Sequence, residues 1–191
     1  SVHSFPTRRS SDLLSSSGSQ IEIGVFCHEF GHAFGLPDLY DTDDDDGDSE
    51  GIGHWGLMGS GNWNSPDTPA HMCAWSKAEL GWLTPAVVTN DLNNFPIISS
   101  TISPTAFKLW KHGTPGSEYF LVENRTADGF DADIKQPGLL IWHVNEDRRS
   151  QVNKDETNKF LDLECADQSG TDHTANADDL DSEANRSDPD D

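Results

Sequence analysis

The feature that most constrains this chain is the segment of residues 28–32, which reads H-E-F-G-H. Apolar and histidine positions around it recur every three to four residues, which predicts a helix over residues 20–34. On a helix, His28 and His32 share one face, because residues four apart are neighbours on its surface. Both imidazoles can then bind one metal ion, with Glu29 beside them as a candidate base. The pattern is typical of zinc hydrolases.

The residues after the helix strengthen this interpretation. Gly35 is suited to a left-handed helix end, and Pro37 cannot continue a helix. The chain can therefore turn back and bring Asp38 to the same ion, giving two imidazoles and one carboxylate. Zn²⁺ is the expected cofactor, although iron or manganese also accepts these ligands. There are two alternatives. One is a surface helix whose two histidines bind nothing, and the other is a structural zinc site.

Several segments then resemble, in order, the immune inhibitor A family of secreted bacterial metalloproteases. They lie between residues 24 and 147 and read GVFCHEFGHAFGLPDLYD, GIGHWGLMGSGNWN, PAHMCAWSKAELGW, EYFLVENR and GLLIWHVNED. The resemblance implies a secreted zinc endopeptidase that cleaves proteins or peptides, with His28 and His32 as ligands and Glu29 as general base. It also implies that Met58 forms a Met-turn beneath the metal. The expected fold class is α+β and metzincin-like: an active-site helix and a C-terminal helix, followed by a small antiparallel β region.

The chain divides into four stretches by composition. Residues 1–13 contain HSFPTRRSSDL, one reading frame of a standard sequencing adapter, so we interpret them as an artefact, the alternative being a disordered leader. Residues 14–85 are expected to be the C-terminal part of a metalloprotease catalytic domain. Residues 86–165 are expected to continue as a β-rich region. Residues 166–191 are acidic, lack apolar periodicity and are expected to be disordered.

Two kinds of element are predicted after the active-site helix. Thr68 and Pro69 resemble a helix start, and the helix should run to Leu80, where Gly81 follows. We expect this helix to pack under the active-site helix. Four β-rich stretches should then form the sheet: 106–111, 118–123, 138–145 and 159–165. Polar residues within these strands, such as Glu123 and His143, are interpreted as satisfied sheet positions.

A dense acidic segment follows the turn that is expected to bring Asp38 to the metal ion. Its candidate calcium ligands are Asp41, Asp43, Asp44, Asp46, Asp48 and Glu50. Carboxylates this close repel one another, and Ca²⁺ is their natural counter-ion, although the spacing does not fit an EF-hand. A solvated acidic loop is the alternative. The segment also keeps a different class of function open, a secreted calcium-binding adhesion or scaffold module with a vestigial metal site.

Net charge limits the possible binding partners, and the cysteine count limits the possible disulfides. The formal net charge is −22 over 191 residues, which disfavours nucleic acid and anionic membranes as partners. No apolar stretch approaches the roughly 18 residues needed to span a membrane. The three cysteines, Cys27, Cys73 and Cys165, argue against a closed disulfide framework but leave a Cys27–Cys73 bridge open. For the reaction itself, Tyr40 is a candidate donor to an oxyanion.

Overall fold

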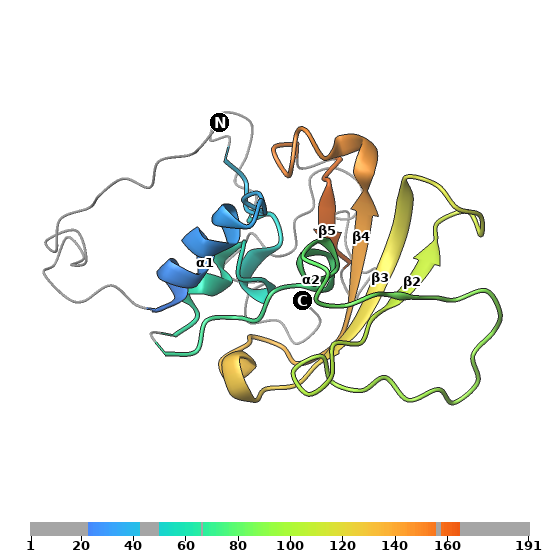
Figure 1. The fold of residues 1–191 in the computed structure, drawn as a ribbon, viewed down its shortest axis with the longest axis horizontal. Coiled ribbons are helices and arrows are strands. Elements are labelled where there is room, and N and C mark those ends of the chain that lie inside the picture. The colour runs from blue at the N-terminus through green and yellow to red at the C-terminus, as the bar shows by residue number, and fades with distance from the viewer. Residues whose placement is uncertain (1–22, 43–49, 66, 156–157, 165–191) are drawn as a thin grey trace, which may run out of the picture.

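The fold combines a helical part with one five-stranded sheet. The computed structural model describes residues 23–42, 50–65, 67–155 and 158–164 (Figure 1). The helices are α1 (Ile23–Ala33) and α2 (Ala74–Glu79), with short 3-10 turns at η2 (Gly53–Trp55), η3 (Ser60–Trp63), η4 (Gly129–Asp131) and η5 (Glu146–Arg148). The strands are β1 (Ala86–Val87), β2 (Phe107–Trp110), β3 (Glu118–Arg125), β4 (Gly138–Asn145) and β5 (Leu161–Leu163). Figure 1 shows α1 at one end, the sheet at the other, and α2 in front of the strands.

The strands lie in the order in which they occur in the sequence, β1-β2-β3-β4-β5. Neighbouring pairs from β2 to β5 are antiparallel, with Phe107 opposite Val122 and Leu121 opposite Trp142. The prediction of an antiparallel sheet is wrong at one edge, because β1 pairs with β2 in parallel. All four predicted β stretches contain a strand. Burial alternates along β3, so every second side chain faces the core.

The second helix differs from the prediction. It begins at Ala74 and not at Pro69, because Cys73 is extended and the main chain before it bonds elsewhere. Ala70 N–H donates to the Gly61 carbonyl, and the His71 carbonyl accepts from Leu57 N–H. These tertiary bonds outweigh the local helix-start signal.

The expected packing of this helix under α1 is also wrong. α2 lies against the sheet, where Ala74 N–H donates to the Glu123 carboxylate at 3.0 Å. The element that packs on α1 is η3, and a Cβ on Gly24 would stand 2.1 Å from the Asn62 carbonyl oxygen. α2 therefore packs on β3 of the sheet, and α1 packs on η3.

One hydrophobic core joins the two parts. It runs from Leu36 and Leu39, on either side of Asp38, to Leu161 and Leu163 on β5. Its largest buried side chains include Trp75 of α2, which meets Phe160 edge to face at 4.8 Å. Cys27 and Cys73 are free thiols, so the two do not form a disulfide. No helix in the described ranges is long and apolar enough to cross a membrane.

A buried charged cluster lies at the same junction. Two cations, Lys77 and Arg125, face two carboxylates, Glu123 and Asp131, and all four side chains are buried. Lys77 Nζ lies 3.3 Å from Glu123, and Arg125 donates through Nε to Asp131 at 2.6 Å. These cations hold the pKa of Glu123 below its usual range even though burial opposes this. Glu123 is thus a satisfied position, as the sequence predicted.

Candidate metal centre

The site begins with the way α1 ends. Gly35 adopts φ +95°, a left-handed conformation that favours glycine. Its N–H donates to the His32 carbonyl, and the next N–H, that of Leu36, donates to the Gly31 carbonyl. This pair of bonds is the Schellman motif, so the predicted glycine-terminated helix is confirmed. The motif reverses the chain and carries Asp38 back over the helix.

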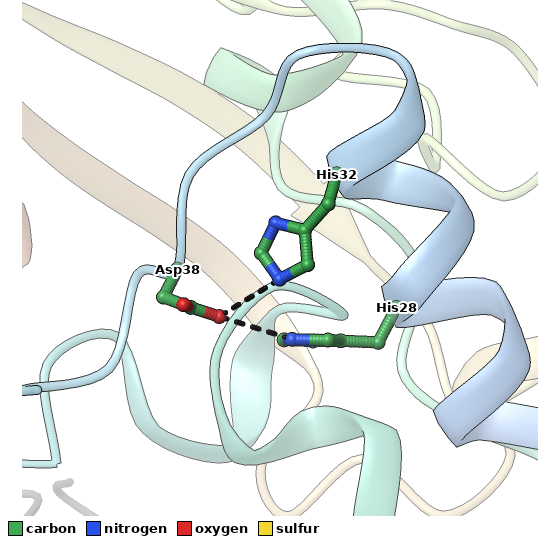
Figure 2. Close-up of side chains that lie close together, drawn as sticks. All are labelled: His28, His32 and Asp38. Carbon is green, nitrogen blue, oxygen red and sulfur yellow. Dashed lines mark hydrogen bonds and ion pairs between the residues drawn. The ribbon is translucent and has the colours of Figure 1, made fainter. Parts of the chain in front are cut away.

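Three side chains then converge on one point. Figure 2 shows His28 and His32, on successive turns of α1, both pointing at Asp38. The Nε2 atoms of His28 and His32 lie 3.0 and 3.1 Å from the same Asp38 oxygen, Oδ1. The candidate ligand atoms of the three residues all lie within 4.8 Å of one another. The structure therefore brings together the three side chains that the sequence predicted as ligands.

Main-chain carbonyls fix how the two imidazoles face this point. His28 Nδ1 lies 2.9 Å from the Leu57 carbonyl, and His32 Nδ1 lies 2.9 Å from the Leu36 carbonyl. A carbonyl oxygen only accepts, so each Nδ1 carries a proton, and a ring without a second proton presents a lone pair at Nε2. Both lone pairs would then face a carboxylate oxygen. Such a contact is repulsive unless a cation lies between the groups.

A metal ion meets this need better than protons on both rings. The rings are 4.8 Å apart between centroids, so two imidazolium charges would repel each other at that distance. A single divalent cation instead satisfies both nitrogens and the carboxylate at once. Nitrogen and oxygen donors of this kind, with further backbone bonds orienting the imidazoles, are the arrangement that protein zinc sites use.

The centre is accessible from one side. The His28 side chain is 8% exposed, whereas the His32 and Asp38 side chains are 33% and 29% exposed. Glu29 is exposed on the same helix. Three protein ligands with an open side leave room for water or substrate, which a catalytic metal requires and a structural metal does not.

Tyr40 lies over the centre. Its ring stacks on His28, with 6.2 Å between centroids and 25° between planes. The pKa of its hydroxyl is raised by burial first, and then by Asp38 and the negative charge of Glu29. The hydroxyl therefore stays protonated and able to donate a hydrogen bond.

Met58 lies under α1. It is 1% exposed, and a Cβ on Gly31 would stand 2.3 Å from its Sδ atom. The thioether therefore fills the space that the missing Gly31 side chain leaves, next to the turn that carries His32. Of the predicted acidic ligands, Asp41 and Glu50 are described, and Glu50 accepts a hydrogen bond from Ser60. The remaining acidic positions, Asp43, Asp44, Asp46 and Asp48, lie outside the described residues.

Two histidines on consecutive helical turns, a glutamate beside the first, and a carboxylate after a glycine turn form a pattern that zinc metalloproteases use. Residues 16–87 match the family described as "Immune inhibitor A peptidase M6, catalytic domain". This range contains the whole centre. The resemblance to the immune inhibitor A-like metalloproteases is thus confirmed over this segment.

Curated relatives also match this chain over short segments. The chain is 40% identical over 60 residues to the pre-pro-metalloprotease PrtV of Vibrio cholerae serotype O1 (strain M66-2), covering 30% of this chain and 6% of that protein. It is 51% identical over 41 residues to immune inhibitor A of Bacillus thuringiensis subsp. alesti, covering 22% of this chain and 6% of that protein. The matched segment thus spans a small part of these relatives. No solved structure matches the chain.

Proposed function

We propose that the chain carries the metal centre of a secreted, metzincin-like zinc endopeptidase. The observation that carries this proposal is the convergence of His28, His32 and Asp38. Nδ1 of each imidazole is already hydrogen-bonded to a main-chain carbonyl. The family match makes peptide hydrolysis the favoured reaction. Under this proposal Met58 serves as the Met-turn residue, and proteins or peptides are the substrates.

The residues of the centre then have distinct roles. His28, His32 and Asp38 would hold zinc, which when bound lowers the pKa of water and polarises the scissile carbonyl. Glu29 takes a proton from the attacking water and delivers it to the leaving amine. Tyr40 donates its hydroxyl hydrogen bond to Asp38 and keeps that carboxylate in place. Its closeness to the open side also makes it the candidate oxyanion donor.

The decisive test separates metal binding from hydrolysis. In the full gene product that carries this chain, Glu29→Gln should leave one zinc bound per chain and lower casein hydrolysis by about 10²–10⁴-fold, the usual contribution of a general base. Metal analysis and a fluorescent casein assay measure the two quantities. Glu79→Gln removes an exposed carboxylate of α2 and serves as the matched control. Retained hydrolysis in Glu29→Gln would reject the assigned base.

The same experiment addresses the alternative function. A calcium-binding adhesion or scaffold module with a vestigial metal site would show no chelator-sensitive casein hydrolysis in the unsubstituted protein. Calcium binding by residues 41–50 is a separate prediction, which calorimetric titration of Ca²⁺ into the zinc-loaded protein would check. A clear exothermic or endothermic isotherm is expected, and a flat one would favour a solvated acidic loop.

A further inference from the structure

A buried asparagine far from Asp38 in sequence hydrogen-bonds to the main chain of the next residue, Leu39. Asn153 lies between η5 and β5 and is 0% exposed. Its Nδ2 donates to the Leu39 carbonyl at 2.9 Å and to the Leu161 carbonyl at 2.8 Å. Its Oδ1 accepts from Leu161 N–H at 3.0 Å. Every strong hydrogen-bonding atom of this amide is therefore used, and only this orientation of the amide satisfies all three bonds.

The peptide groups of Leu39 are held from three sides. Leu39 N–H donates to the Met58 carbonyl at 2.8 Å, and its carbonyl accepts from Ile52 N–H at 3.0 Å as well as from Asn153. A Cβ on Gly51 would stand 2.1 Å from the Leu39 carbonyl oxygen, so glycine is required for this close approach. Three segments distant in sequence thus fix the residue that immediately follows the ligand Asp38.

We propose that Asn153 is a positioning residue for the metal centre, which holds Asp38 in its ligating place through the peptide group of Leu39. The inference rests on the proposed role of His28, His32 and Asp38 in binding zinc. Asp38 can reach both imidazoles only if the main chain on either side of it is fixed. The Schellman motif at Gly35 fixes one side, and the bonds to Leu39 fix the other.

The backbone next to Asn153 supports a specific role. Val152 has φ +54°, a left-handed conformation that is an outlier for a β-branched residue. Such conformations persist where the surrounding structure requires them, and they gather at sites with a function. Here the turn aims the amide of Asn153 inward, toward Leu39 and β5. The family match ends at residue 87, so this contact adds a residue from the β-rich region to the metal centre.

The first test compares two variants that both weaken the anchoring of β5. Asn153→Ala removes the bond to Leu39, whereas Leu163→Ala removes a buried side chain of β5 that makes no hydrogen bond to the metal-binding turn. Zinc affinity is measured by competition with a chelating dye, and unfolding by urea gives the stability of each variant. Asn153→Ala should bind zinc about 10–100-fold more weakly, as loss of an outer-shell partner does, and Leu163→Ala should not. The visible spectrum of the cobalt-loaded protein should change in Asn153→Ala alone.

A second measurement needs no substitution, which covers the case in which Asn153→Ala does not fold. Coupling between two sites is reciprocal, so zinc must also stabilise the bonds of Asn153. Zinc should slow hydrogen exchange at the Leu161 amide as well as at the Leu39 and Ile52 amides. Equal zinc affinities in the two variants, or an unchanged Leu161 amide, would overturn the proposal. If the unsubstituted protein binds no zinc, the proposed function itself fails.

Discussion

Tyr40 shows how one residue can serve a metal centre without binding the metal. Its ring stacks on His28, and its hydroxyl interacts electrostatically with Asp38, so it lies beside two of the three candidate ligands. Burial and two nearby carboxylates keep its pKa raised, so the hydroxyl stays protonated. A hydroxyl that donates to the Asp38 carboxylate would hold it in one orientation. Tyr40 therefore reduces the freedom that Asp38 would lose on binding a metal.

Removing the hydroxyl alone tests this role. Tyr40→Phe keeps the ring on His28 and removes the hydroxyl that can donate to Asp38. We expect zinc affinity to fall about tenfold, the lower end of the range for outer-shell partners, with little change in unfolding free energy. Competition with a chelating dye measures the affinity, and Tyr119→Phe, whose hydroxyl bonds to Glu146, is the control. An unchanged affinity in Tyr40→Phe would show that the hydroxyl does not orient the carboxylate.

At this scale the sequence predicts which side chains meet better than it predicts the groups that hold them in place. His28, His32 and Asp38 could be predicted because the spacing on a helix and a glycine turn are local signals. The carbonyl of Leu57 and the amide of Asn153 could not, because they come from distant segments and carry no motif. A main-chain carbonyl has no sequence signature at all.

At the scale of elements, two glycines decide how closely α1 approaches its neighbours. Gly24 faces the main chain of Asn62, and Gly31 faces the side chain of Met58. Glycine in a helix is usually unfavourable by about 1 kcal/mol relative to alanine. Here the contacts reverse that preference, because a methyl group would meet a backbone oxygen at one site and a thioether at the other.

The two glycines should respond differently to alanine. Gly24→Ala should lower the unfolding free energy by about 1–3 kcal/mol or more, because a main-chain carbonyl cannot move aside. Gly31→Ala should cost less, because Met58 can change rotamer. Urea unfolding measures both. Gly116→Ala, where a Cβ meets only an atom at 3.9 Å, should change stability by less than about 0.5 kcal/mol. Stabilisation by Gly24→Ala would contradict the packing of η3 on α1.

The elements themselves were predicted well where local periodicity agrees with the fold. The alternation in β3 and β4 indicates strands, and the structure has them at 118–125 and 138–145. The start of α2 was predicted too early, because Thr68 and Pro69 resemble a cap while the main chain of Ala70 and His71 bonds to other loops. Tertiary hydrogen bonds of this kind are invisible in a local pattern.

At the scale of the whole molecule, buried charges join the helical part to the sheet. Arg125 of β3 bonds to Glu123, to Asp131 and to the main-chain carbonyls of Trp55 and His71. It is 0% exposed. Its carboxylate partners are buried as well, so each buried charge depends on the oppositely charged neighbours to offset its loss of water. One side chain thus fixes the position of η2, of the segment before α2 and of η4 relative to the sheet.

Loss of Arg125 should therefore be severe. Arg125→Met keeps much of the volume and leaves Glu123 and Asp131 partly uncompensated, which should lower the unfolding free energy by about 3–5 kcal/mol. Arg149→Met removes a surface cation that pairs with Glu79 and should cost about 1 kcal/mol or less. Urea unfolding followed by tryptophan fluorescence compares the two. Similar losses in both variants would show that the buried cluster contributes no more than a surface pair.

The hydrogen bond from Ile52 N–H to the Leu39 carbonyl closes the base of the segment between these residues. A loop that is closed at its base can change length at little thermodynamic cost, because each doubling adds only about 0.6 kcal/mol of closure entropy. Insertions and deletions between Tyr40 and Glu50 should thus be tolerated by the centre that holds His28, His32 and Asp38.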